Sequence, residues 1–112
     1  MHEEQRGLRL PFSAKAEVFV ENSATGIPSR VTELSLRGCR LEMSGSFAEH
    51  QRVIVKVFHS GEYVEAPSTV IYANASGVGL LFGDVKPLFR EVLQKWVLSE
   101  LDKQTEAERP KS

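Results

Sequence analysis

The chain has 112 residues, of which 41% are hydrophobic and 26% are charged, values typical of one globular domain that is soluble in water. Fourteen basic and fifteen acidic residues leave a formal net charge of −1, so we expect no bulk attraction to long nucleic acids or anionic membranes. The sequence contains neither a run of the roughly 20 apolar residues that a membrane-spanning helix needs nor a secretory leader. We therefore expect a cytoplasmic protein that does not insert into membranes.

Most of the chain has the pattern of β-strands. Gly38 interrupts the pattern and predicts a bulge or sharp bend between two strands. Pro67 lacks an amide donor, which predicts an edge or bulge at that position. Alternating apolar and polar residues, rich in Val, Ile and Thr, predict strands over residues 14–21, 30–36, 39–43, 52–59, 63–74 and 78–82.

The hydrophobic period changes to that of a helix at Pro87. Apolar residues recur at helical spacing in two neighbouring rows, which predict an amphipathic helix over residues 87–101. The two rows are Leu88, Val92 and Trp96, and Phe89, Leu93 and Val97.

Six strands followed by one helix favour an antiparallel β-barrel, with the helix closing one opening and Trp96 as its plug. This barrel and its helix would form one domain over residues 14–101. We expect residues 1–13 to form a flexible arm. The polar residues 102–112 cannot bury enough surface to offset their ordering entropy, so we expect a disordered tail there.

Catalytic motifs are not apparent in the sequence. The histidines His2, His50 and His59 lack partners at metal-ligand spacing, and we expect each to be an ordinary surface residue. Cys39 is the single cysteine, which excludes an internal disulfide and a cysteine-built metal site and favours an inert buried thiol. The sequence therefore predicts a protein that is not an enzyme and holds no metal.

Two short motifs carry a resemblance to a known family. A basic segment, Gln-Arg-Gly-Leu-Arg over residues 5–9, precedes the segment Glu-Leu-Ser-Leu-Arg-Gly-Cys-Arg-Leu over residues 33–41. This pair resembles the PilZ domain family of bacterial cyclic di-GMP receptors, marked by Arg-x-x-x-Arg and a later Asp/Asn-x-Ser-x-x-Gly. Residues 77–82 are also similar to the last strand of that family. The resemblance covers roughly residues 5–101 and implies a six-stranded barrel, a C-terminal helix and no cofactor besides the nucleotide.

The sequence departs from the family motifs at two positions. Gln5 stands where the first arginine belongs, although Arg9 fills the second place and Arg6 is adjacent. Glu33 replaces the aspartate and is longer by one methylene, whereas Ser35 matches the second motif.

The residues themselves suit a nucleotide ligand. A guanidinium can pair with phosphate or form a fork onto guanine O6 and N7. Glu33 and Ser35, two apart on a predicted strand, are expected on one face, where they could accept and donate hydrogen bonds. Gly38 would let the ligand approach the backbone, and nearby arginines would add positive charge. The predicted site comprises Gln5, Arg6, Arg9, Glu33, Ser35, Arg37, Gly38 and Arg40.

Three functions remain open at this point. The leading hypothesis is a receptor that binds cyclic di-GMP and thereby switches contact with an effector protein. Gln5 and Glu33 suggest the alternative of a degenerate PilZ-like adaptor that binds no nucleotide and works in motility or pilus machinery. A small barrel that binds single-stranded RNA or DNA would need exposed aromatics among basic residues. Because most aromatics are assigned to the core, we expect no nucleic acid polymer as partner.

Overall fold

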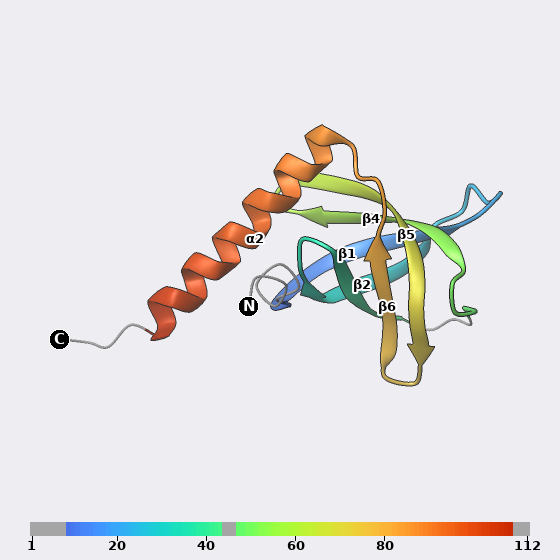
Figure 1. Cartoon of the computed structure of the whole chain (residues 1–112), viewed down its shortest axis with the longest axis horizontal. Coiled ribbons are helices and arrows are strands. Elements are labelled where there is room, and N and C mark those ends of the chain that lie inside the picture. Colours follow the sequence, from blue (N-terminus) through green and yellow to red (C-terminus); the bar gives the residue numbers. More distant parts are fainter. Residues whose placement is uncertain (1–8, 44–46, 109–112) are drawn as a thin grey trace.

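The computed structural model describes residues 9–43 and 47–108. Within them the predicted antiparallel barrel with a C-terminal helix is confirmed (Figure 1). The elements are β1 (Leu10–Val20), β2 (Ile27–Leu34), β3 (Gly38–Glu42), β4 (Arg52–His59), β5 (Glu62–Asn74), β6 (Gly77–Phe82) and α2 (Pro87–Glu108).

The strands close on themselves in the order β1-β2-β3-β6-β5-β4, and every neighbouring pair is antiparallel. β1 pairs with both β2 and β4, so the sheet has no free edge. Pro67 accordingly does not lie at an edge. Its carbonyl accepts the amide of Gly83, just past the end of β6. The N–H and C=O groups of a strand residue point to the same side, so the missing N–H of Pro67 would also face the end of β6, where the pairing of β5 with β6 stops.

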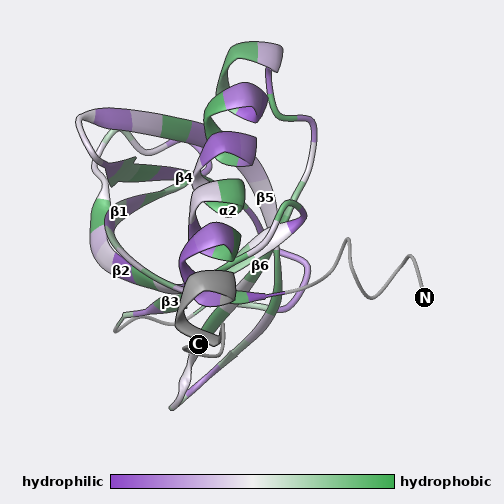
Figure 2. Ribbon diagram, turned by 90° about the vertical axis from the view of Figure 1, so that its left-hand side faces the viewer, coloured by the Kyte–Doolittle hydropathy of each residue, from purple (hydrophilic) through white to green (hydrophobic). Residues whose placement is uncertain are grey.

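Alternation along the strands separates the core from the outer wall. In β4, Val53, Val55 and Val57 are buried, whereas Ile54 and Phe58 between and after them are exposed. Successive side chains of a strand point to opposite faces, so each strand contributes one row to the barrel interior. The bands of hydrophobic and hydrophilic colour along the strands in Figure 2 follow this pattern.

The helix α2 lies against the end of the barrel where β1 begins and β4 ends, and then extends beyond it (Figure 1). Trp96 is buried there, with its ring centroid 5.8 Å from that of Phe12 and 5.4 Å from that of His59. This confirms the predicted packing of Trp96 at the barrel end. His59 is half-buried between aromatic rings, which corrects its assignment as an ordinary surface histidine.

The packed face of α2 differs slightly from the predicted one. Leu93, Trp96 and Val97 are buried, but Leu88 is 77% exposed. At 3.6 residues per turn, Leu88 lies well round the helix from the line through Leu93 and Val97. Leu88 therefore does not contribute to the core. No helix among the described residues is long and apolar enough to cross a membrane.

Several expected boundaries also move, the largest shifts being at the start of β1 and at the end of α2, and β2 spans Ile27–Leu34 rather than residues 30–36. β1 begins at Leu10 rather than at residue 14, because Leu10 and Phe12 continue the buried alternation and Leu10 pairs with Leu34. The helix continues to Glu108, past the expected end at residue 101. Residues 102–108 are mostly good helix formers, and they extend a helix that is already nucleated by its packed half.

Candidate functional site

Ser35 holds the turn between β2 and β3. Its hydroxyl oxygen accepts the amides of Arg37 and Gly38, each at 3.1 Å, and donates to the Gly38 carbonyl at 3.3 Å. The residue is 3% exposed. We expected Ser35 to share an outward strand face with Glu33, but β2 ends at Leu34 and the chain turns inward. Ser35 is therefore positioned to organise the turn rather than to face a ligand.

Gly38 is required by the contact between β3 and β6. A Cβ atom at this position would lie 2.1 Å from the carbonyl oxygen of Leu80. The neighbouring carbonyl of Arg37 accepts the amide of Phe82 at 2.7 Å, which ties the turn to the end of β6. We expected Gly38 to let a ligand approach the backbone. The space beside Gly38 is instead occupied by the backbone of β6.

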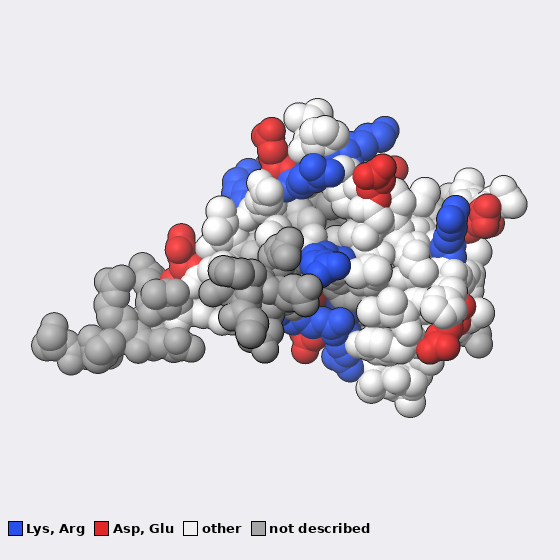
Figure 3. All heavy atoms as spheres, in the orientation of Figure 1, with Lys and Arg blue, Asp and Glu red and all other residues white. Residues whose placement is uncertain are grey.

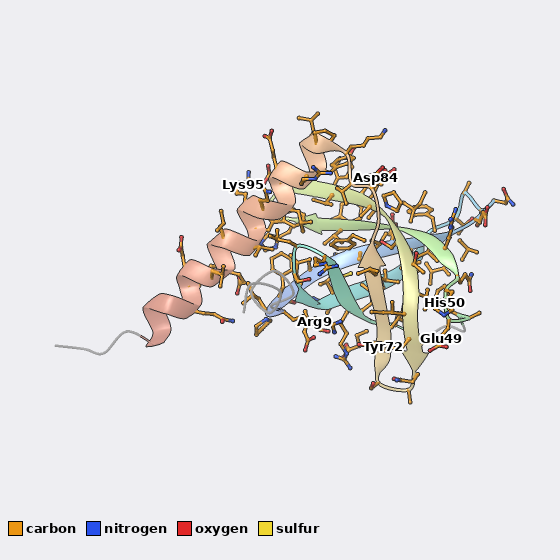
Figure 4. All side chains as sticks on the ribbon, in the orientation of Figure 1. Arg9, Glu49, His50, Tyr72, Asp84 and Lys95 are labelled. Carbon is orange, nitrogen blue, oxygen red and sulfur yellow. The ribbon has the colours of Figure 1, made fainter. Side chains whose placement is uncertain are left out.

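A row of outward positions crosses four adjacent strands beside this turn. The strand register pairs Glu33 with Arg40, Arg40 with Gly79, and Gly79 with Tyr72. We call Glu33, Arg40, Gly79 and Tyr72 the outer-wall row. Figure 4 shows Tyr72 on the same side of the barrel as Arg9. The row combines a carboxylate, a guanidinium and an aromatic ring on one continuous surface.

Arg9 adds a second guanidinium to one end of the outer-wall row. It directly precedes β1, and because Pro11 pairs with Glu33, Arg9 lies diagonally across from Glu33. Its Nη1 atom lies 3.7 Å from Oε1 of Glu33, and the two side chains are 42% and 41% exposed. The structure thus brings together one residue from each of the two sequence motifs, at a place open to solvent.

Arg40 is held across the outer wall by its neighbours. Its guanidinium donates to Oγ1 of Thr32 at 3.3 Å and to the carbonyl of Ser76 in the β5–β6 turn. The preceding residue, Cys39, points into the core, where burial raises the pKa of its thiol to about 12. Cys39 is therefore the inert buried thiol that the sequence predicted.

Sequence reasoning missed Tyr72 and Gly79. The Tyr72 ring rests against Gly79, because a Cβ at Gly79 would lie 2.2 Å from Cε2 of the ring. A glycine inside a strand often marks a position that another group approaches closely, and this was the signal in the sequence that could have indicated the contact. The register of β5 against β6 also shifts between Val70 and Tyr72, which alternation along a single strand cannot reveal.

The remaining three predicted site residues are not part of the outer-wall row. Arg37 is exposed, but it lines a groove beside α2 rather than the outer-wall row. Gln5 and Arg6 lie outside the described residues. Figure 3 shows basic side chains gathered in the middle of the face that Figure 1 presents, with acidic ones nearby. Across residues 9–43 and 47–108, no cluster of histidine, cysteine and carboxylate side chains could hold a metal ion.

Comparisons with known proteins agree with this architecture. The family model described as PilZ domain matches residues 3–99. The PilZ domain of CeSA from a cellulose-synthesizing bacterium has a TM-score of 0.68 at 17% identity, over 81% of this chain and 95% of that one. The Bacillus subtilis inhibitor of motility, MotI/DgrA, has a TM-score of 0.67 at 11% identity. That match covers 90% of this chain but only 50% of MotI/DgrA. No curated protein matches the chain.

Proposed function

Because this chain belongs to the PilZ domain family, we propose that it binds cyclic di-GMP at the outer-wall row and Arg9. The observation that carries the proposal is the meeting of Arg9 and Glu33, which come from separate motifs and lie 3.7 Å apart at an exposed position. The domain would act as a binding module rather than as an enzyme.

The chemistry of the row matches the parts of this nucleotide. Cyclic di-GMP carries two phosphate charges and two guanines, and arginine can pair with the phosphates or form a fork onto guanine O6 and N7. Arg9 and Arg40 supply guanidinium groups for these contacts. The carboxylate of Glu33 can accept the N–H groups of guanine, and the ring of Tyr72 offers a surface on which a base can stack.

The ion pair between Arg9 and Glu33 is compatible with the proposed site. Both side chains are about two-fifths exposed, and such surface pairs contribute only about 0–1 kcal/mol. A hydrogen bond to a charged group contributes about 1.5–3 kcal/mol, and arginine can form two such bonds to guanine. The nucleotide can therefore displace this pair and leave a net gain in free energy.

Binding would act through a partner protein. One of the similar structures is that of an inhibitor of motility, which supports an effector in motility machinery. The adaptor alternative uses the same fold without the nucleotide. Titration calorimetry with cyclic di-GMP separates the two functions, because a chain that stays folded but takes up no nucleotide contradicts the receptor and favours the adaptor.

Replacement of Arg9 tests the site itself. We expect Arg9→Gln to weaken binding of cyclic di-GMP about tenfold, through the loss of one charge-assisted contact. The matched control is Arg52→Gln, because Arg52 is also exposed but lies away from the row. Equal affinity of the native chain and Arg9→Gln would place the site elsewhere.

A further inference from the structure

A groove separates the β2–β3 turn from the beginning of α2. Its volume is about 290 Å³. Val85 and Leu93 are buried beneath it, whereas Leu36 and Leu81 on its walls are 41% and 43% exposed. Exposed apolar side chains at the wall of a groove provide apolar surface that a bound molecule can remove from water.

The charged residues of this groove are all of one sign. Arg37 and Arg90 line it, and among residues 9–43 and 47–108 no acidic side chain is part of its lining. The guanidinium of Arg90 is anchored by a 3.1 Å hydrogen bond from Nη2 to the carbonyl of Val85. Figure 3 shows a hollow between α2 and the barrel, with basic side chains on both sides of it.

A second groove provides a contrast. It is larger, about 850 Å³, and lies where β1 ends and β4 begins, with residues 67–69 of β5 also in its lining. Its polar lining mixes Glu21 and Asp84 with Arg52, so its charge selects no particular ligand. The smaller groove instead combines two guanidiniums with two exposed leucines, a lining whose charge and polarity complement a carboxylate with apolar neighbours.

We propose that the smaller groove binds a segment of a partner protein in which an acidic residue is flanked by apolar side chains. The apolar side chains would cover Leu36 and Leu81, and the carboxylate would lie between Arg37 and Arg90. This proposal goes beyond nucleotide binding, since no member of the outer-wall row lines the groove. Its test requires no nucleotide.

The test uses three matched peptides and the amide resonances of the ¹⁵N-labelled full chain. The probe is acetyl-Leu-Asp-Leu amide, and the controls carry Asn or Lys in the central place. We expect saturable shifts at Leu36, Leu81 and Arg90 with the aspartate peptide. Binding should be at least fivefold weaker with asparagine and absent with lysine.

Two substitutions test the walls of the groove independently. Arg90→Gln removes a charge and Leu36→Ser removes an apolar contact, and each should weaken binding of the aspartate peptide at least threefold. Arg52→Gln, in the larger groove, should leave the peptide affinity unchanged.

Several outcomes would overturn the proposal. One is equal affinity for the three peptides, and another is a set of shifts that surrounds Arg52 instead. Hexathymidylate that bound here as tightly as the aspartate peptide would indicate a general anion site. The same shifts on raising the protein concentration alone would indicate that a second copy of the chain fills the groove.

Discussion

The β2–β3 turn and the outer-wall row are built from neighbouring residues of one sequence motif, yet they differ in burial and bonding. In the turn, Ser35 is 3% exposed and its hydroxyl takes part in three hydrogen bonds within the turn. Two residues earlier, the side chain of Glu33 is 41% exposed and forms an ion pair with Arg9 across the surface. The motif thus combines residues that shape the fold with residues that are free to meet a ligand.

The energetic consequences of the two regions differ in the same way. Loss of a buried hydroxyl that accepts backbone amides leaves an unsatisfied donor, at a cost of about 1–3 kcal/mol in folding free energy. Loss of an exposed ion pair costs about 0–1 kcal/mol. Substitutions in the turn should therefore change stability, and substitutions in the row should change ligand affinity.

The largest expected effect is that of Gly38→Ala on stability. The new Cβ would lie 2.1 Å from the Leu80 carbonyl oxygen, and backbone on both sides must shift, at a cost of about 3 kcal/mol. Urea unfolding measures the loss. The control is Gly83→Ala, whose Cβ would be at an ordinary 3.4 Å from the nearest atom. Similar urea midpoints of unfolding for the two variants would contradict the close contact between Gly38 and β6.

Tyr72 tests the row through affinity. Tyr72→Leu keeps an apolar side chain against Gly79 but removes the ring, and it should weaken binding of cyclic di-GMP roughly tenfold, because stacking of a base contributes about 1–3 kcal/mol. Calorimetry provides the affinity. Tyr63→Leu is the matched control, since Tyr63 is exposed beside Phe58 and Phe89 on another face. A larger loss in the control would shift the site away from the row.

Cys39 sharpens the comparison, because it lies between turn residue Gly38 and row residue Arg40. Burial raises the pKa of its thiol to about 12, from an ordinary value of 9.0. The thiol ionises at a lower pH in the unfolded chain than in the folded one. The stabilisation of the folded state by the neutral thiol is therefore fully present below pH 9 and is lost as the pH rises toward 12. The alkaline fall in unfolding free energy should be smaller in Cys39→Ala. An identical fall in both proteins would contradict the burial of this thiol.

The sequence predicts the local part of this structure well. Alternation reveals the strands because one face of each is buried, and helical spacing identifies Trp96, Leu93 and Val97 as core. The inward turn at Ser35 is missed because alternation assumes that the strand continues, whereas β2 ends at Leu34.

The site is only partly predictable for a related reason. The motifs identify Arg9, Glu33 and Arg40, which lie near one another in the fold. Gly79 and Tyr72 join them only through pairings between strands that are distant in sequence. Those pairings depend on the barrel order and on a register shift in β5, neither of which is encoded in a local pattern.

The most direct test of the division between turn and row compares Glu33→Gln with Ser35→Ala. Each variant is measured twice, by urea unfolding and by calorimetric titration with cyclic di-GMP. We predict that Glu33→Gln keeps nearly native stability and loses most of its affinity, whereas Ser35→Ala loses about 1–3 kcal/mol of stability. The opposite pattern, with a stable Ser35→Ala variant and full affinity in Glu33→Gln, would contradict the account.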